Sequence, residues 1–429
     1  MVFLVNLPNG STYPAQSQLN YRPNYWLFHG GDTIYLNMKN QAVYVCAARR
    51  SAIGAFNGSL SKITAPQIAA SVITSLAAKK IVSQVDEVLL GNVLSAGIGQ
   101  NPARIAATYA GLTHEIPATT INQVCASGLR SIALAHDLLQ LGKRQLIVAG
   151  GMENMSQAPF LLSEYRCGRK LGHRKLIDSL LHDGLWCALT DQHMGVTAEN
   201  LVKKYKITRA KMDAFAHESH QKAVKATRTG KFNEEIVPIQ IQNRNGTVVF
   251  AKDEQPRTNS SVMKLAELKP AFLETGQVTA GNSSTINDGA AAVLIAGETT
   301  AKKLRLKPMA RVVDYAVVAL DPNFMGLGAA LAAQKCLQQM KMKTSDINLW
   351  EINEAFAAQA LTVIDKLQLD PEKVNVNGGA IALGHPIGAS GARIVTTLLH
   401  EMQKQKVRFG VASLCVGGGQ GIAMLFERV

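Results

Sequence analysis

The sequence has few cysteines and aromatic residues, and it lacks long apolar runs. The six cysteines are scattered along the chain, at positions 46, 125, 167, 187, 336 and 415. No two are spaced as in a zinc or redox motif, and nothing resembles the disulfide framework of a small secreted domain. We therefore expect reduced thiols, no bound metal and a cytoplasmic protein. Because no apolar run is long enough to span a bilayer, we expect no membrane partner.

Aromatic residues make up only 6% of the chain, whereas the formal net charge is +14. A basic protein favours anionic partners, including nucleic acid, anionic membranes and phosphorylated small molecules. Nucleic acid bases stack on aromatic side chains, which are scarce here, and the basic residues are dispersed. We therefore expect no nucleic-acid partner.

The first 37 residues differ from the rest of the chain. They carry only two charged side chains, Arg22 and Asp32, and show no regular periodicity. They lack the basic start of a secretory signal and the arginine content of a mitochondrial presequence. We expect residues 1–37 to be an extension that is disordered or not native, with Met38 as the functional start. An ordered N-terminal arm is the alternative.

Apolar patterns alternate between strands and helices. In the first half they predict a strand over 41–48, a helix over 67–80, a helix over 126–143 and a strand over 145–151. This alternation indicates an α/β fold with a largely parallel sheet. The second half repeats the order from a strand over 310–319 to a helix over 388–405, which favours an internal duplication. The more polar residues 155–286 have the composition of an inserted loop domain.

Four segments carry candidate chemistry, and Cys125 stands in the first. They are NQVCASGLR around Cys125, INEAFA around Asn353, LGHPIGASG around His385 and LCVGGGQG around Cys415. Cys125 follows a predicted strand and precedes a predicted helix. A helix N-terminus lowers the pKa of a thiol, so we predict a reactive Cys125. The alternative is a buried, inert cysteine.

The four segments together favour nucleophilic catalysis over four separate structural roles. A cysteine nucleophile needs a base, which His385 can supply. Cys415 offers a second thiol that can exchange a proton, and the glycines after it leave backbone N–H groups open to an oxyanion. Asn353 can position a water. Few reactions need both one thiol that carries an acyl group and a second thiol that moves a proton.

In these segments the chain from Met38 to Val429 resembles the thiolase family, in its acetyl-CoA C-acetyltransferase type. The resemblance implies a thiolase fold, in which two βαβαβαββ halves form a five-layered αβαβα arrangement with an inserted loop domain. It places the N-terminal half at 38–154 and 287–308, the loop domain at 155–286 and the C-terminal half at 309–429. It also implies a homotetramer.

The mechanism that the resemblance implies is a ping-pong condensation of two acetyl-CoA into acetoacetyl-CoA and CoA. His385 helps Cys125 attack acetyl-CoA, and Cys415 then removes a proton from the second acetyl-CoA. His385 and a water on Asn353 hold the enolate oxygen, while the N–H groups of Cys125 and Gly417 hold the other oxyanion. The reverse reaction is thiolysis. CoA is substrate and product, and no cofactor is expected.

The resemblance further implies a set of substrate-binding residues. They are His193, Met194, Ser284, Ala355 and Phe356. Met194 is expected to narrow the acyl pocket of a short-chain enzyme, with simple core packing as the alternative. Thr285 departs from the pattern, because short-chain members generally have glycine there.

Other functions stay open at this point. A degradative 3-ketoacyl-CoA thiolase of fatty-acid β-oxidation would share the catalytic residues and accept longer chains. An inactive thiolase-fold protein that binds lipid or CoA should have lost at least one of the four candidate groups, and all are present. A basic RNA-binding protein would bind nucleic acid with steep salt dependence and transfer no acyl group.

Overall fold

The structure is a computed structural model that describes residues 41–429, apart from 164–165, 167, 169–170 and 245. The expected extension over 1–37 and the expected start at Met38 lie outside the described residues. Among the described residues, no helix is both long and apolar enough to cross a membrane. In the same part of the chain, no three His, Cys, Asp or Glu side chains are grouped as a metal ion would require.

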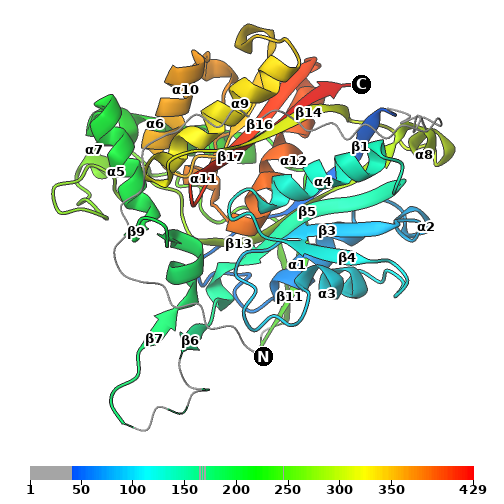
Figure 1. Cartoon of the computed structure of the whole chain (residues 1–429), viewed down its shortest axis with the longest axis horizontal. Helices are drawn as coiled ribbons and strands as arrows, with labels where there is room; N and C mark the ends of the chain where they lie inside the picture. Colours follow the sequence, from blue (N-terminus) through cyan, green and yellow to red (C-terminus); the bar gives the residue numbers. More distant parts are fainter. Residues whose placement is uncertain (1–40, 164–165, 167, 169–170, 245) are drawn as a thin grey trace, which may run out of the picture. The chain divides into compact units, whose positions relative to one another are not determined.

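One large mixed sheet runs through both halves of the fold (Figure 1). Its main path is β4 (Ala118–Ile121), β3 (Glu87–Gly91), β5 (Leu146–Asn154), β13 (Asn287–Gly297), β1 (Val43–Ser51), β14 (Ala310–Ala319), β17 (Gln420–Arg428), β16 (Phe409–Val416) and β15 (Leu349–Ile352). The strands from β4 to β1 belong to the first half, and those from β14 to β15 belong to the second. Antiparallel pairing of β1 with β14 joins the two.

Each half repeats one order of elements, which confirms the duplication. The first half runs β1, α1 (Ala65–Thr74), β3, α3 (Pro102–Tyr109), β4, α4 (Ser127–Gln140), β5 and β13. The second half runs β14, α9 (Gly328–Gln339), β15, α10 (Ala357–Leu367), α12 (Ile387–Gln405), β16 and β17. Where the second half would have a counterpart of β4, Val374 forms an isolated parallel bridge with Trp350 of β15.

The helices form three layers, with α4 and α12 in the middle (Figure 1). A hydrophobic core containing residues of both helices joins them to β1, β5, β13, β14, β16 and β17. Helices α1 and α3 cover the outer face of the first half, and α9 and α10 cover that of the second. The first-half and second-half strands of the sheet form the two β layers between these three helix layers. The predicted five-layered αβαβα fold is therefore confirmed. Every residue over 387–402 of α12 is buried, as expected for a helix without a solvent face.

The predicted largely parallel sheet is wrong. β3 pairs parallel with β4 and β5, and β15 pairs parallel with β16, but the pairs nearer the centre are antiparallel. The second half ends on two strands without a helix between them, and in the first half β13, which follows the inserted region, also returns antiparallel to β5. β16 and β17 are joined by a short turn in which Gly418 and Gly419 adopt φ of +80°, and such a connection reverses the chain. The alternating pattern did not reveal this final hairpin.

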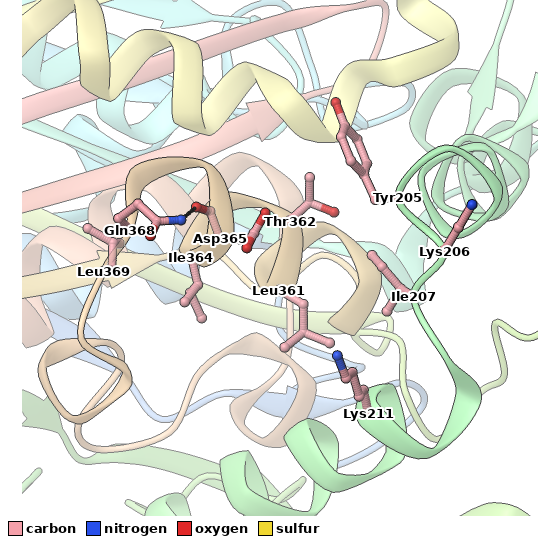
Figure 2. Close-up of a pocket in the computed structure, with 10 residues that line it drawn as sticks. All are labelled: Tyr205, Lys206, Ile207, Lys211, Leu361, Thr362, Ile364, Asp365, Gln368 and Leu369. Atoms are coloured by element: carbon pink, nitrogen blue, oxygen red, sulfur yellow. Dashed lines mark hydrogen bonds between the residues drawn. The ribbon is translucent and has the colours of Figure 1, made fainter.

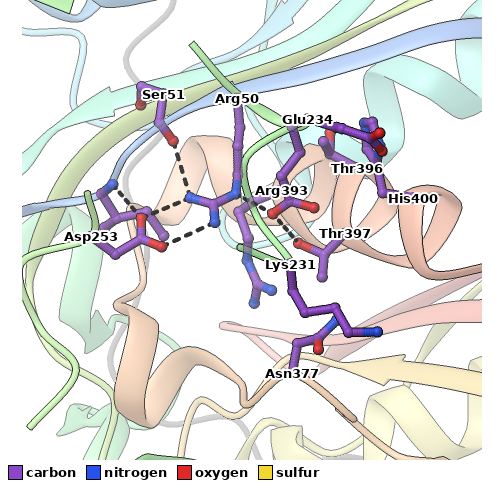
Figure 3. A network of polar contacts seen from close by, with 12 residues as sticks. Arg50, Ser51, Lys231, Glu234, Asp253, Asn377, Arg393, Thr396, Thr397 and His400 are labelled. Carbon is purple, nitrogen blue, oxygen red and sulfur yellow. Dashed lines mark hydrogen bonds and ion pairs between the residues drawn. The ribbon is translucent and has the colours of Figure 1, made fainter. Parts of the chain in front are cut away.

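The described part of 155–286 packs against the body through a buried ionic network (Figure 3). Arg50 of β1 is 0% exposed, and its guanidinium contacts Glu235 Oε1 at 2.6 Å and Asp253 Oδ1 at 2.7 Å. The short strand β10 (Ile236–Val237) pairs parallel with β1 beside this network. Because removal of one partner would leave an uncompensated buried charge, the network holds this region in place.

The remaining helices and strands are shorter or lie mostly in the inserted region. The helices are α2 (Lys79–Val82), α5 (Met194–Tyr205), α6 (Arg209–Arg228), α7 (Val262–Ala266), α8 (Glu298–Lys303) and α11 (Ala380–Leu383). The strands are β2 (Gly54–Ala55), β6 (Phe160–Leu162), β7 (Leu176–Asp178), β8 (Trp186–Cys187), β9 (Gln192–His193), β11 (Ile239–Asn243) and β12 (Gly246–Phe250).

We predict that Gly128→Ala destabilises the fold. A Cβ at Gly128 of α4 would lie 2.8 Å from the Ala392 backbone nitrogen of α12, so the two helices would have to separate. Overpacking of this kind costs about 1–3 kcal/mol. Urea unfolding checks the loss, with Lys225→Ala on the exposed face of α6 as a control expected to stay within about 0.5 kcal/mol of wild type. Equal stability of the two variants would contradict the close contact.

Candidate active site

Cys125 stands in a tight turn between β4 and α4. Val124, directly before it, has φ of +47°, which is a strained conformation for a β-branched residue. Ser127 stabilises the turn, because its N–H and its hydroxyl both donate to the Val124 carbonyl, at 3.0 Å and 2.7 Å. Backbone strain of this kind persists where the surroundings impose it, and it is concentrated at functional sites. The turn leaves Cys125 partly exposed.

The predicted lowering of the Cys125 pKa by a helix N-terminus is wrong. Helix α4 begins at Ser127 with Ala126 as its N-cap, so Cys125 lies outside the helix. Burial raises the pKa of the Cys125 thiol to about 11, although hydrogen bonds from the Gly417 and Cys125 backbone N–H groups favour the thiolate. Desolvation of the thiolate outweighs these donors. In the free protein Cys125 is therefore a thiol that needs a base to react.

Cys415 and Gly417 lie beside Cys125. Cys415, near the end of β16, is 1% exposed, and burial raises its pKa, with a further increase whenever the nearby Cys125 is a thiolate. A Cβ at Gly417 would lie 3.4 Å from Val124 Cγ1 and 3.3 Å from Met194 Sδ. The structure thus brings the two predicted thiols and the predicted oxyanion donor together, and it places Met194 against them.

His385 follows α11 and Gly384, whose φ is +105°. Its backbone N–H donates to Asn287 Oδ1 at 2.9 Å, and its Nδ1 lies 2.6 Å from Ser390 Oγ. Its Nε2 is buried and has no hydrogen-bond partner among the described residues. Burial lowers the pKa of His385 to about 3, with a further contribution from the positive charge of Arg393. The imidazole is therefore neutral near pH 7 and can accept a proton.

Asn353 is 0% exposed and follows β15, where its backbone N–H donates to the Ser413 carbonyl at 2.9 Å. Within the described part of the chain, neither Oδ1 nor Nδ2 of Asn353 has a partner. An unpaired buried polar atom costs about 1–3 kcal/mol, so such atoms are rare without a functional reason. Both atoms can bind a small polar group such as a water.

A cavity of about 510 Å³ collects most of the predicted substrate-binding residues. His193, Met194, Ser284 and Phe356 line it, together with His385. Phe272 was not predicted, and its ring links two of these residues. It stacks on His193 at 4.8 Å between ring centroids and meets Phe356 edge-on at 6.0 Å.

Ala355 does not line this cavity. It is buried, and its carbonyl accepts a hydrogen bond of 3.0 Å from the Ser284 backbone N–H, so it supports the cavity wall. The sequence interpretation missed Gln255 and Arg257, which also line the cavity. The charged run KDEQPR over 252–257 was the available signal, but nothing in it indicates which side chains reach the cavity.

A second hollow, of about 470 Å³, lies between the α5–α6 connection and α10 (Figure 2). Tyr205, Lys211, Leu361 and Asp365 are among its lining residues. None of the predicted site residues lines it, so the candidate active site is the cavity that contains His385.

The chain belongs to the thiolase family. Residues 43–299 match the family described as "Thiolase, N-terminal domain", and residues 306–428 match "Thiolase, C-terminal domain". The family predicted from the four segments is therefore confirmed.

Among the relatives is an acetyl-CoA acetyltransferase of Pseudomonas aeruginosa, 51% identical over 391 residues that cover 90% of this chain and all of that protein. A crystal structure of the Bacillus anthracis acetyl-CoA acetyltransferase superposes with a TM-score of 0.89 at 44% identity, over 92% of this chain and all of that one. Human mitochondrial 3-ketoacyl-CoA thiolase superposes with a TM-score of 0.88 at 40% identity, over 91% of this chain and all of that one.

We predict that the alkylation rate of Cys125 by iodoacetamide rises about tenfold per pH unit between about pH 7 and pH 9, because only the thiolate reacts. Because the pKa of Cys125 is raised to about 11, its thiolate fraction keeps increasing with pH even where the pH exceeds the pKa of a free thiol. Peptide mass spectrometry at Cys125 measures the rate. A small free thiol is the control, because its alkylation rate levels off at a lower pH. A rate that is constant over this range would indicate a preformed thiolate and contradict the raised pKa.

Proposed function

We propose that this chain is an acetyl-CoA C-acetyltransferase that condenses two acetyl-CoA into acetoacetyl-CoA and CoA, and catalyses the reverse thiolysis. The observation that carries the proposal is the contact of Cys125 with Cys415 and Gly417, with Met194 beside Gly417 and lining the same cavity as the neutral His385. The names of the Pseudomonas and Bacillus proteins support it. CoA is substrate and product, and the reaction needs no further cofactor.

In the first half-reaction Cys125 Sγ attacks the carbonyl carbon of acetyl-CoA while its proton moves to His385 Nε2. The backbone N–H groups of Cys125 and Gly417 donate to the oxyanion, a kind of contact that typically contributes about 3 kcal/mol. When the bond from the acetyl carbon to the CoA sulfur breaks, Cys415 gives its proton to that sulfur. CoA leaves, and the enzyme holds an acetyl-cysteine, an imidazolium and the thiolate of Cys415.

In the second half-reaction the Cys415 thiolate removes a methyl proton from a second acetyl-CoA. The enolate oxygen accepts hydrogen bonds from His385 and from a water on Asn353, whose side-chain atoms are otherwise unpaired. The enolate carbon attacks the acetyl-cysteine, and the bond to Cys125 breaks. The imidazolium returns its proton to Cys125, so all three groups regain their initial protonation states.

Met194 restricts the reaction to short acyl groups. Its side chain is 8% exposed, lines the cavity and lies next to Gly417. A longer acyl group must displace it from the hydrophobic core of the second half. The human mitochondrial relative supports the alternative, a 3-ketoacyl-CoA thiolase with broader chain length.

At the cavity wall, the exposed Arg257 suits the phosphates of CoA, because guanidinium groups bind phosphate bidentately.

The remaining expectations complete the proposal. The chain acts as a homotetramer in the cytoplasm, with the domain limits given above. Support for association comes from the β6–β7 hairpin, where Phe160 is 64% exposed and Leu176 is 65% exposed. Large exposed hydrophobic side chains that lie together mark contact surfaces.

We predict that wild-type protein incubated with acetyl-CoA gains the mass of one acetyl group and that Cys125→Ala gains none. Intact-mass spectrometry measures the adduct. Cys336→Ala is the control, because Cys336 is a second free cysteine that lies buried in α9, away from the cavity. An adduct that persists in Cys125→Ala would overturn the choice of nucleophile. A wild-type protein without any adduct would favour the inactive CoA-binding alternative.

We predict that thiolysis falls sharply beyond four-carbon 3-ketoacyl-CoA and that Met194→Ala reduces this fall. Each extra methylene that can then be buried contributes about 0.8 kcal/mol. Steady-state rates with a graded series of 3-ketoacyl-CoAs measure the effect. The control is Met212→Ala, which removes a buried methionine from the same core but outside the cavity. Similar wild-type rates along the series would instead identify a degradative thiolase.

A further inference from the structure

Ser390 lies in the first turn of α12 and is 1% exposed. Its Oγ makes two short contacts, to His385 Nδ1 at 2.6 Å and to the Pro386 carbonyl oxygen at 2.8 Å. The hydroxyl therefore lies between a carbonyl, which can only accept a hydrogen bond, and a ring nitrogen, which can either donate or accept.

The number of hydrogens in this arrangement determines the tautomer of the imidazole. Two oxygens 2.8 Å apart need a hydrogen between them, and the Pro386 carbonyl has none, so Ser390 donates to Pro386. The Ser390 hydroxyl has no second hydrogen, so it must accept from Nδ1 of His385. A neutral imidazole carries only one N–H, which leaves a lone pair on Nε2. Nε2 is the ring atom that has no partner among the described residues.

We infer that Ser390 is a positioning residue that keeps His385 in the Nδ1–H tautomer and so makes Nε2 the proton acceptor for Cys125. This inference rests on the proposed function, because it specifies how the base of that reaction is prepared. Ser390 acts through His385 and is not itself a base.

The backbone around His385 is held independently of Ser390. Asn287 accepts the His385 N–H at 2.9 Å and donates through Nδ2 to the Gly54 carbonyl, also at 2.9 Å. Three residues further on, the Gly388 N–H donates to Glu153 Oε2 at 2.8 Å. Loss of the Ser390 hydroxyl should therefore leave the segment in place and release only the orientation and tautomer of the ring.

Without the Ser390 hydroxyl, either ring nitrogen can carry the proton. The molecules with a proton on Nε2 cannot accept the proton of Cys125, so the acylation rate falls while the substrate-binding cavity stays unchanged. General-base catalysis contributes about 100-fold or more to such steps, so a partial loss should be at least about tenfold. The change should appear in kcat, with KM nearly constant.

The matched pair of variants is Ser390→Ala and Thr396→Val. Thr396, labelled in Figure 3, lies in the same helix, is 0% exposed and donates to the Ala392 carbonyl four residues earlier at 2.9 Å, as Ser390 does to Pro386. Thr396→Val removes an equivalent helix bond without touching a histidine. We expect Ser390→Ala to lose at least about tenfold in kcat, Thr396→Val to remain near wild type and Ser390→Thr to recover most of the loss. Equal kcat in Ser390→Ala and wild type would overturn the inference.

A measurement that does not depend on activity separates this inference from the proposed function. The ¹⁵N spectrum of protein labelled at histidine reports which ring nitrogen carries the proton, and His385→Gln assigns the signal. We expect a protonated Nδ1 in wild type and a mixture of tautomers in Ser390→Ala. A wild-type signal with the proton on Nε2 would refute the role of Ser390, whether or not the protein transfers acetyl groups. Absence of acyl transfer with a protonated Nδ1 would instead refute the proposed function alone.

Discussion

The close contact of α4 with α12 is the constraint on which the rest of the structure depends. Gly128 allows the two helices to approach until a Cβ would meet the opposing backbone. Each helix is preceded by a candidate catalytic segment, because Cys125 lies just before α4 and His385 just before α12. The distance between the helices therefore sets the distance between these segments. The outer helices and the strands hold this pair in place from both sides.

Burial sets the chemical state of the site. It raises the pKa values of both thiols and lowers that of His385, so the free protein holds neutral groups instead of a thiolate and an imidazolium. Charge then has to form when substrate is present, next to the N–H groups that can stabilise it. The strained backbone at Val124 and the unpaired atoms of Asn353 are energetic costs that the tightly packed surroundings sustain.

The inserted region lines part of the cavity and is tied to β1 by buried charge. Arg50 contacts two carboxylates of this region, and β9 and the start of α5 bring His193 and Met194 to the cavity. Buried ion pairs add little net stability, but loss of one partner is costly, so they hold the region in a defined position. The cavity thus has walls from the body and from the insertion, and their relative placement determines its width beside Met194.

The sequence by itself determined the alternation of helices and strands, the duplication and the four segments with Cys125, Asn353, His385 and Cys415. These features follow from local periodicity and from residue types that recur at fixed spacing, so they need no knowledge of distant contacts. Only the tertiary structure decided the antiparallel centre of the sheet, the raised pKa of Cys125 and the contact of Ser390 with His385. Each of these depends on which distant segments exclude water or come within hydrogen-bond distance. A local pattern contains no information about either, because desolvation and hydrogen-bond geometry arise from packing between residues far apart in the chain.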